Sequence, residues 1–416
     1  MTNHTQETHT HESFHKTRFA VIWMNILSEP LFTVYGLLAF ILRKDLNASI
    51  FQIAILMMLR PVVSILSLYW SHTFGRRRDR LLSNVMTAEI LSRAPFLLFP
   101  FTNNVWLIIA CSAFHMMMRR GGVPAWMEIL KLNLPSKERN RIFSQGSVVA
   151  YAEGVLLAIP IGYLLDSNPH MWRWLFPACA LLGIASVALQ ARIPIPLEKL
   201  PMSFEPHGAS IWKKILDPWV QSIQLLKSRP DFARFQAGFM ICGFGLMLMQ
   251  PALPLYFADV LNISYTDLMI ALSVCRGMGY IISSGYWAQW LSKVGIFQFT
   301  SAVNVAVALS FCLMILAQFH IAGLYSAYFL YGIFLAGSHL SWNLSGPLFS
   351  HNEDSSVFTG VNIVTVGIRG SVGPALGGFL CVLLGPTSVF FIGIGFCTLA
   401  ASKMAEWSKT ATITTH

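Results

Sequence analysis

Two stretches of the chain, LNASIFQIAILM at residues 46–57 and LNISYTDLMIAL at residues 261–272, open with the same Leu-Asn-x-Ser pattern and lead into apolar segments. They lie 215 positions apart. Offsets of 215 or 216 also separate further matching pairs: Arg18-Phe19 and Arg234-Phe235, Arg60 and Arg276, Trp126 and Trp342, Ile142-Phe143-Ser144 and Val357-Phe358-Thr359, and Gly162 and Gly377. A near-constant offset at equivalent points of equivalent segments indicates that one unit was duplicated.

The composition places both copies in a membrane. Of the 416 residues, 55% are hydrophobic and 12% are charged, whereas a soluble domain carries about a quarter charged residues. So few charges exclude a soluble enzyme of this length, and the 30 Phe and 12 Trp exclude a disordered chain. Twelve apolar runs reach the roughly 20 residues that a membrane-spanning helix needs. They are 19–42, 49–72, 81–101, 104–130, 142–165, 171–191, 233–258, 267–291, 295–318, 320–348, 356–384 and 386–407.

We therefore expect an all-α polytopic membrane protein of twelve transmembrane helices, arranged as two parallel-repeated six-helix bundles. An even number of helices in each unit leaves the two halves parallel, related by an axis along the membrane normal. The predicted organisation is a cytoplasmic N-terminal tail (1–18), a first bundle (19–191), a cytoplasmic linker with interfacial helices (192–232), a second bundle (233–407) and a C-terminal tail (408–416). Asp217-Pro218 is expected to divide the amphipathic part of the linker into two short helices.

The net charge of +10 is distributed unevenly along the chain. With the N-terminus inside, the cytoplasmic segments carry 20 Lys and Arg residues, and the outer loops carry 3, namely Arg43, Lys44 and Arg173. This asymmetry predicts that both termini lie in the cytoplasm. Residues 1–15 are polar and do not form a signal peptide, and the short loops favour a multi-pass protein of the bacterial cytoplasmic (inner) membrane.

Six arginines remain within the apolar runs themselves: Arg60, Arg93, Arg119, Arg120, Arg276 and Arg369. An arginine at the centre of a membrane helix costs roughly 2.5–3.5 kcal/mol, so each of them is a functional-site hypothesis. A guanidinium group keeps its charge and binds carboxylate or phosphate through two hydrogen bonds, which suits an anionic solute. A structural role, in which the arginine holds neighbouring helices together, remains an alternative for Arg60 and Arg276. It is the favoured role of Arg120.

The candidate site residues are drawn from these charges and from polar and aromatic residues near them. The predicted solute-binding residues are Arg119 with His115 and Trp126 on the same helix face, then Arg60, Arg276 and Arg369, and finally the cluster of His339, Trp342 and Asn343.

Three acidic residues complete the prediction. Glu153 and Glu29 are the proton-coupling candidates, because removal from water favours the protonated carboxyl group. Glu89 and Arg93 are spaced i,i+4 and are expected to form a structural pair on one helix face.

The twelve predicted spans, the two parallel six-span halves and the long basic central loop resemble the major facilitator superfamily over the whole chain, and two local motifs match that family in part. Gly370-x-x-Gly373-Pro374-x-x-Gly377-Gly378 resembles the Gly-Pro motif in the eleventh helix of the major facilitator superfamily, and Gly75-Arg76-Arg77 resembles the end of the family's motif between its second and third helices. His72 stands where that motif has Asp, and Leu68 stands where it has its first Gly. The resemblance implies a twelve-helix secondary transporter that works by alternating access.

The expected function is secondary active transport of a small organic anion, coupled to protons, by a monomer in the lipid bilayer. Export of drugs or neutral solutes is the alternative, and a non-transporting membrane receptor on the same scaffold is an alternative of another class. The chain carries no catalytic motif, so it is not expected to be an enzyme. It shows neither a phosphate-binding GxxxxGK[ST] loop nor a CxxC pair, so no cofactor and no metal are expected. No nucleic-acid partner is expected, since a cytoplasmic loop accounts for Arg76-Arg77-Arg78.

Overall fold

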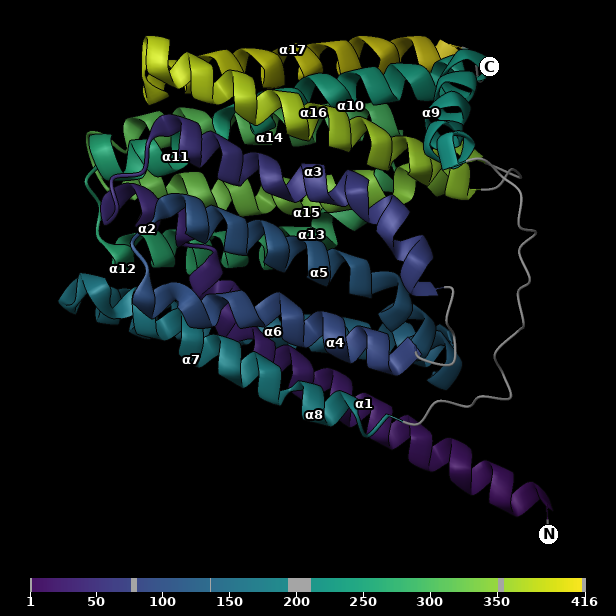
Figure 1. The fold of residues 1–416 in the computed structure, drawn as a ribbon. Helices are drawn as coiled ribbons and strands as arrows, with labels where there is room; N and C mark the ends of the chain where they lie inside the picture. Colours follow the sequence, from purple (N-terminus) through teal and green to yellow (C-terminus); the bar gives the residue numbers. More distant parts are fainter. Residues whose placement is uncertain (1, 76–80, 135, 194–210, 351–354, 414–416) are drawn as a thin grey trace. The chain divides into compact units, whose positions relative to one another are not determined.

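The computed structural model describes residues 2–75, 81–134, 136–193, 211–350 and 355–413, and the regular structure in these ranges is entirely helical (Figure 1). The prediction of an all-α fold is therefore confirmed. Arg76, Arg77 and Arg78 of the basic loop lie outside the described residues, as does the Pro-rich start of the linker at 194–210.

The N-terminal half consists of long helices joined by short breaks. Its elements are α1 (Thr2–Tyr35), α2 (Leu38–Lys44), α3 (Ile50–Gly75), α4 (Leu81–Arg93), η2 (Ala94–Phe101), α5 (Val105–Asn133), α6 (Ser136–Ser167), η3 (Pro169–Met171), α7 (Trp172–Ala185) and α8 (Val187–Gln190).

The C-terminal half follows the same plan after the linker helix α9 (Ile211–Ser228). Its further elements are α10 (Pro230–Met249), α11 (Ala252–Leu255), η5 (Tyr256–Val260), α12 (Tyr265–Met269), η6 (Ile270–Cys275), α13 (Arg276–Leu291), α14 (Ile296–Leu316), α15 (Ala322–Ser350), α16 (Ser355–Leu384) and α17 (Pro386–Ile413).

Each of the twelve predicted apolar runs falls on helical segments in the described part of the chain. Among the described residues, eight helical segments are by themselves long and apolar enough to cross a membrane. Two of the runs outside this set lie on α4 and α5, which carry Glu89 with Arg93 and Arg119 with Arg120, respectively. The charged residues that mark these helices as functional candidates also lower their hydropathy.

The structure shows how the helices run at two boundaries of the predicted domains. Most of the predicted cytoplasmic N-terminal tail (1–18) is helical, since α1 begins at Thr2 and runs without a break to Tyr35. The amphipathic part of the linker forms one helix, α9, instead of two. Its apolar residues continue on one helical face through the Asp217-Pro218 step, so the pattern favours a single helix over a break there.

The chain forms two compact units. One comprises Met1–Leu46 and Val63–Pro206, and the other comprises Asn47–Val62 and His207–His416. The first half of α3 thus packs with the C-terminal half of the chain. Within that second unit, α10 lies beside α16 and α17 (Figure 1).

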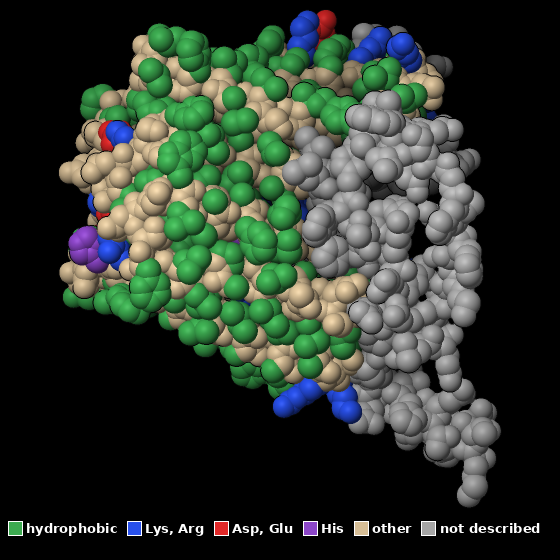
Figure 2. Space-filling model, viewed as in Figure 1, with side chains coloured by type: hydrophobic (Ala, Val, Ile, Leu, Met, Phe, Trp, Pro, Cys, Tyr) green, Lys and Arg blue, Asp and Glu red, His purple; other side chains and the backbone are tan. Residues whose placement is uncertain are grey.

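Large apolar side chains cover the outer faces of the helices. Ile281 is 68% exposed and Phe391 is 61% exposed, and many similar residues share this exposure. Figure 2 shows hydrophobic side chains spread over the visible described surface, with Lys and Arg near its margins. Such an apolar surface is unfavourable in water and favourable in lipid. A helix is also suited to lipid because its backbone hydrogen bonds are made within the helix.

The duplicated Leu-Asn-x-Ser motif builds the same kind of helix start in both copies. At the start of α3, the backbone N–H of Gln52 donates to Ser49 Oγ at 3.2 Å, and the backbone N–H of Ser49 donates to Gln52 Oε1 at 2.8 Å. At the start of α12, the Asp267 amide donates to Ser264 Oγ at 2.9 Å. In each copy the serine hydroxyl oxygen accepts a hydrogen bond from the backbone N–H three residues later. This bond satisfies one of the N–H groups that have no partner within the first helical turn.

The glycine motif of α16 allows this helix to approach α10 closely. A Cβ atom at Gly373 would lie 2.7 Å from Met247 Cβ, and one at Gly377 would collide with the Leu248 carbonyl oxygen. Only glycine leaves room for backbones at this distance. The motif therefore helps to set the position of Arg369, which lies about one turn before Gly373 and about two turns before Gly377 on α16.

Candidate functional site

Arg119 of α5 lies against α1 in the first unit. Its Cζ atom is 3.8 Å from the ring centroid of Phe32, which places the guanidinium over the face of the aromatic ring. A cation over an aromatic face is stabilised by the ring quadrupole, so Phe32 holds the guanidinium in place. Arg119 is exposed in the structure.

The two predicted proton-coupling carboxylates lie at the same place. Glu29 is one turn before Phe32 on α1 and interacts electrostatically with both Arg119 and Glu153. Its Oε1 atom lies 3.0 Å from the position of a Cβ atom at Gly154, so the carboxylate packs against the backbone of α6. In the described part of the chain, Glu153 Oε2 is buried without a hydrogen-bond partner. The first unit thus brings Arg119, Glu29 and Glu153 together from α5, α1 and α6.

His115 is one turn before Arg119 on α5, but its ring is buried, with 2% of the residue exposed. Its Nδ1 atom lies 2.7 Å from the Ser92 carbonyl oxygen, and its ring lies 4.9 Å from Phe96 and 5.2 Å from Tyr35, centroid to centroid. The structure therefore places His115 in a helix–helix contact.

Trp126, the third residue of the predicted face of α5, lies on the other side of Arg119. It is half-buried and packs against two apolar clusters, which include Ala20, Ile129 and Leu130. Of the three residues predicted on this face of α5, Arg119 is therefore the one that interacts with a carboxylate.

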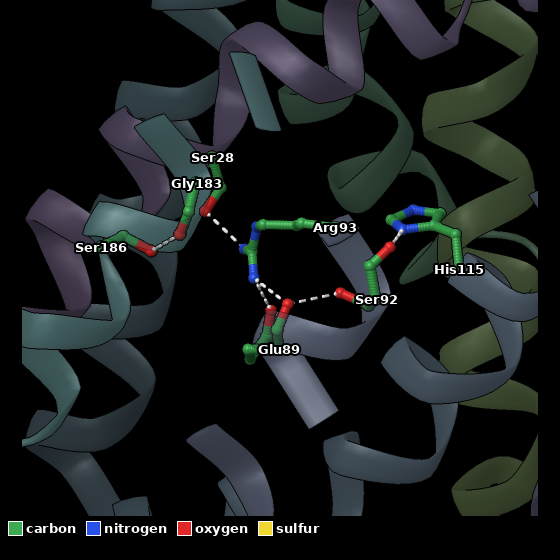
Figure 3. Close-up of polar contacts among 7 residues, drawn as sticks. All are labelled: Ser28, Glu89, Ser92, Arg93, His115, Gly183 and Ser186. Carbon is green, nitrogen blue, oxygen red and sulfur yellow. Dashed lines mark hydrogen bonds and ion pairs between the residues drawn. The ribbon is translucent and has the colours of Figure 1, made fainter. Parts of the chain in front are cut away.

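Glu89 and Arg93 form a salt bridge within α4 (Figure 3). Arg93 Nη1 donates to the Glu89 carboxylate and, at 3.0 Å, to the Glu89 carbonyl oxygen, and Nη2 donates to Ser28 Oγ of α1 at 2.9 Å. The Arg93 side chain is only 4% exposed. Gly183 of α7 lies directly beside it, since a Cβ atom there would be 2.7 Å from Arg93 Cδ. The pair links α4 to α1 and fills the space next to α7.

Arg369 of α16 is buried in the second unit. Its Nη1 atom donates to the Phe239 carbonyl oxygen of α10 at 2.6 Å, and its Cζ atom lies 4.5 Å from the Phe239 ring centroid. The Phe239 ring also lies beside Trp342 of α15, with the two ring centroids 5.8 Å apart. The guanidinium also packs against Gly243, where any side chain would displace it.

The other predicted solute-binding residues of the second unit lie on or near α13 and α15. His339 and Asn343 are exposed and one turn apart on α15, and His339 Nδ1 lies 3.3 Å from Tyr280 Oη. Arg276 and Arg60 both interact electrostatically with Tyr331 of α15. The two arginines that matched at an offset of 216 therefore lie near one tyrosine.

Several residues of these sites were not predicted from the sequence. Phe32 and Phe239 each hold a guanidinium, but a lone Phe in an apolar run carries no signal. A buried polar network was also missed: Gln236 Nε2 donates to Asn362 Oδ1, and Asn362 Nδ2 donates to Ser345 Oγ at 3.0 Å. Polar amides inside apolar runs are the signal that could have found it. Among the described residues, no group of three or more His, Cys, Asp or Glu side chains could hold a metal ion.

Long apolar helices with exposed apolar faces and buried charges define a multi-pass integral membrane protein. Residues 21–368 match the family model of the Major Facilitator Superfamily, and the chain belongs to this family of membrane transporters. A search of curated proteins finds no match.

Solved transporters share the fold. A mutant of the nucleoside transporter NupG superimposes with a TM-score of 0.71 at 15% identity, covering 93% of this chain and 99% of that one. An inward-facing bacterial homologue of the human lysosomal transporter Spinster gives a TM-score of 0.69 at 12% identity, with 96% and 97% covered. A POT family transporter in complex with 5-aminolevulinic acid gives 0.65 at 12% identity, with 95% and 96% covered. At these identities the likeness is one of fold.

Proposed function

We propose that this chain is a secondary active transporter that moves a small organic anion across the membrane by alternating access, coupled to protons. The observation that carries the proposal is the cluster in the first unit. There, Arg119 lies over Phe32 and interacts with Glu29, which in turn interacts with Glu153. A cation beside two carboxylates can couple the uptake of a proton to the binding of an anion.

The charges of the cluster suggest how this coupling works. Two neighbouring carboxylates away from bulk water do not readily both stay ionised. When both carboxylates are ionised, the Glu29 carboxylate neutralises the charge of Arg119 and repels an incoming anion. When one of them takes up a proton, Arg119 becomes available for a carboxylate or phosphate of the solute. Loss of the proton on the other side of the membrane restores the competition and releases the solute.

The second unit supplies the remaining proposed solute contacts. Arg60 and Arg276 near Tyr331 add positive charge, and the exposed His339 and Asn343, with Trp342 beside them, add hydrogen-bonding and stacking groups. His115 and Trp126 act in the proposal through the packing of α5, which positions Arg119. Glu89 and Arg93 serve as the structural pair that holds α4 against α1.

The proposed setting is the cytoplasmic membrane of a bacterium, with both termini inside and the protein working as a monomer and a symporter. The distribution of 20 basic residues on one side and 3 on the other supports this orientation. Export of drugs or neutral solutes is the competing function within the family.

Counterflow in proteoliposomes tests the proposal. Vesicles preloaded with an unlabelled solute take up the labelled form only if the protein exchanges it. A panel of monocarboxylates, phosphate esters, nucleosides and quaternary amines is expected to give counterflow with an anion and none with the amines. Arg119→Gln is expected to abolish it. Lys131→Gln removes one positive charge from an exposed position of the same helix, where Lys131 pairs with Glu128 at 3.6 Å, and is expected to behave as the native protein. Normal counterflow in Arg119→Gln, or counterflow with nucleosides or amines alone, would overturn the proposal.

A further inference from the structure

A small cavity lies between α10, α14, α15 and α16 in the second unit. Arg369 lies at its wall, together with the polar residues Thr300, Asn304, Ser338 and Ser341. The space open to the centre of a water molecule is about 30 Å³. None of the residues that line the cavity is acidic.

The Arg369 guanidinium brings a positive charge to this cavity, and no acidic residue lines the cavity in the described part of the chain. The residue is 7% exposed, and its Nη1 atom is bonded to the neutral Phe239 carbonyl oxygen. Its Nε atom is buried and meets no hydrogen-bond acceptor in the part of the chain that the structure describes. A buried charge without a counter-charge is strongly unfavourable, because it loses the solvation of water and gains nothing in return.

A second unpaired donor lies at the same cavity. Asn304 of α14 is 3% exposed, and its Nδ2 atom likewise meets no acceptor among the described residues. The Thr300 and Ser341 hydroxyl oxygens lie 3.2 Å apart in the same wall, and one of the two hydroxyls can turn its proton into the cavity. Buried donors are almost always paired in native proteins, so two unpaired donors at one cavity point to an acceptor that fills it.

The size and charge of the cavity select the acceptor. About 30 Å³ of free space accommodates one or two water-sized particles, since a single water needs about 10–15 Å³ on this measure. Organic solutes occupy sites of about 300–1,000 Å³. The sequence-based assignment of Arg369 to the organic solute therefore does not suit the space beside it. We propose that this cavity binds one small inorganic monovalent anion, a halide such as chloride.

The bound halide would join four helices of the second unit. Arg369 provides the counter-charge from α16, Asn304 and Thr300 provide donors from α14, and Ser338 and Ser341 belong to α15, with the Phe239 backbone of α10 on the far side of the guanidinium. The ion would stabilise the folded unit and stay in place while the organic solute is carried. This inference does not depend on the identity of that solute.

Thermal unfolding of the purified full-length protein in detergent tests the proposal. Chloride and bromide are titrated against gluconate at constant ionic strength, because gluconate is too large for the cavity. A ligand that binds only the folded state raises the unfolding temperature in a concentration-dependent way. We expect a saturable increase with chloride and bromide and none with gluconate. The absence of a halide-dependent increase would overturn the proposal.

Three variants locate the effect. Asn304→Leu keeps the number and branching of the side-chain heavy atoms but removes the donor, and it is expected to raise the half-saturating chloride concentration at least about tenfold, as is Arg369→Gln. Ser310→Ala is the matched control on the same helix, since the Ser310 hydroxyl donates to the Val307 carbonyl of its own helix at 2.8 Å and does not line the cavity. It is expected to leave the half-saturating concentration unchanged. If Asn304→Leu responds to chloride as the native protein does, the cavity is not the site.

A crystal structure with bromide provides a measurement that does not rely on stability, should Arg369→Gln fail to fold. An anomalous peak beside Arg369 Nε and Asn304 Nδ2 is expected. A water molecule in that position, with no anomalous signal, would contradict the assignment. Because neither experiment measures transport, both outcomes are independent of the counterflow assay.

Discussion

Asn47 and Asn262 lie 215 positions apart and adopt the same left-handed backbone conformation, with φ angles of 51° and 46°. In the described part of the chain they are the two non-glycine residues with positive φ. Each stands two positions before a serine that caps the following helix. Asparagine tolerates this conformation better than most residues. The duplication inferred from the sequence thus extends to backbone geometry at equivalent turns.

Phe32→Leu is expected to weaken solute binding by about 2- to 30-fold, because it removes a cation–aromatic contact that contributes roughly 0.5–2 kcal/mol. The guanidinium of Arg119 loses the ring that lies 3.8 Å from its Cζ atom. The measurement is the KM of uptake in proteoliposomes. Phe32→Tyr keeps an aromatic face and is expected to stay close to the native KM. Equal KM values in all three proteins would remove Phe32 from the site.

Glu153→Gln is expected to separate proton coupling from solute exchange. The amide cannot take up a proton, so uptake driven by an inward proton gradient is expected to fall at least about tenfold and to lose its dependence on pH. Counterflow needs no net proton movement and is expected to persist. Glu406→Gln changes an exposed carboxylate that pairs with Lys403 at 2.9 Å near the end of α17 and serves as the control. Gradient-driven uptake by Glu153→Gln with native pH dependence would contradict the coupling role.

Glu89→Gln is expected to destabilise the protein without changing its chemistry. It leaves the buried Arg93 charge without a carboxylate, and breaking a buried pair costs about 3–5 kcal/mol. The unfolding temperature in detergent is expected to drop, while transport per folded molecule stays native. The double variant Glu89→Gln with Arg93→Met removes both charges and is expected to recover part of the loss. A Glu89→Gln protein as stable as the native one would show that the pair does not hold α4 in place.

Gly377→Ala is expected to lower the unfolding temperature, because the added Cβ atom would collide with the Leu248 carbonyl of α10. Overpacking of this kind costs about 1–3 kcal/mol. Gly395→Ala is the matched control, since a Cβ atom at Gly395 of α17 meets nothing within 4 Å. Alanine there is expected to leave stability unchanged or slightly increased. If both variants behave alike, close approach is not the reason for glycine at position 377.

Much of the fold could be predicted from local patterns. The apolar runs predicted where helices lie, because a membrane-spanning helix is specified by its own hydropathy and length. The polar residues before such a run are less well specified: α1 starts at Thr2, ahead of the apolar run that begins at residue 19, and a polar helix and a polar tail look alike in composition. Asp217-Pro218 is a local signal for a helix start, but the apolar face of α9 continues through it and the helix does not break there.

For the candidate site, too, the sequence accounts for one part and the tertiary structure for another. The sequence alone determined that six arginines and several glutamates lie within membrane helices, since charge in an apolar run needs no knowledge of neighbours. Only the tertiary structure decided their partners. Helix packing brings Glu29 to Arg119, buries His115 against the Ser92 carbonyl, and gives Arg369 a small cavity. These contacts join residues far apart in the chain, and they depend on which helix faces pack together, which no single helix encodes by itself.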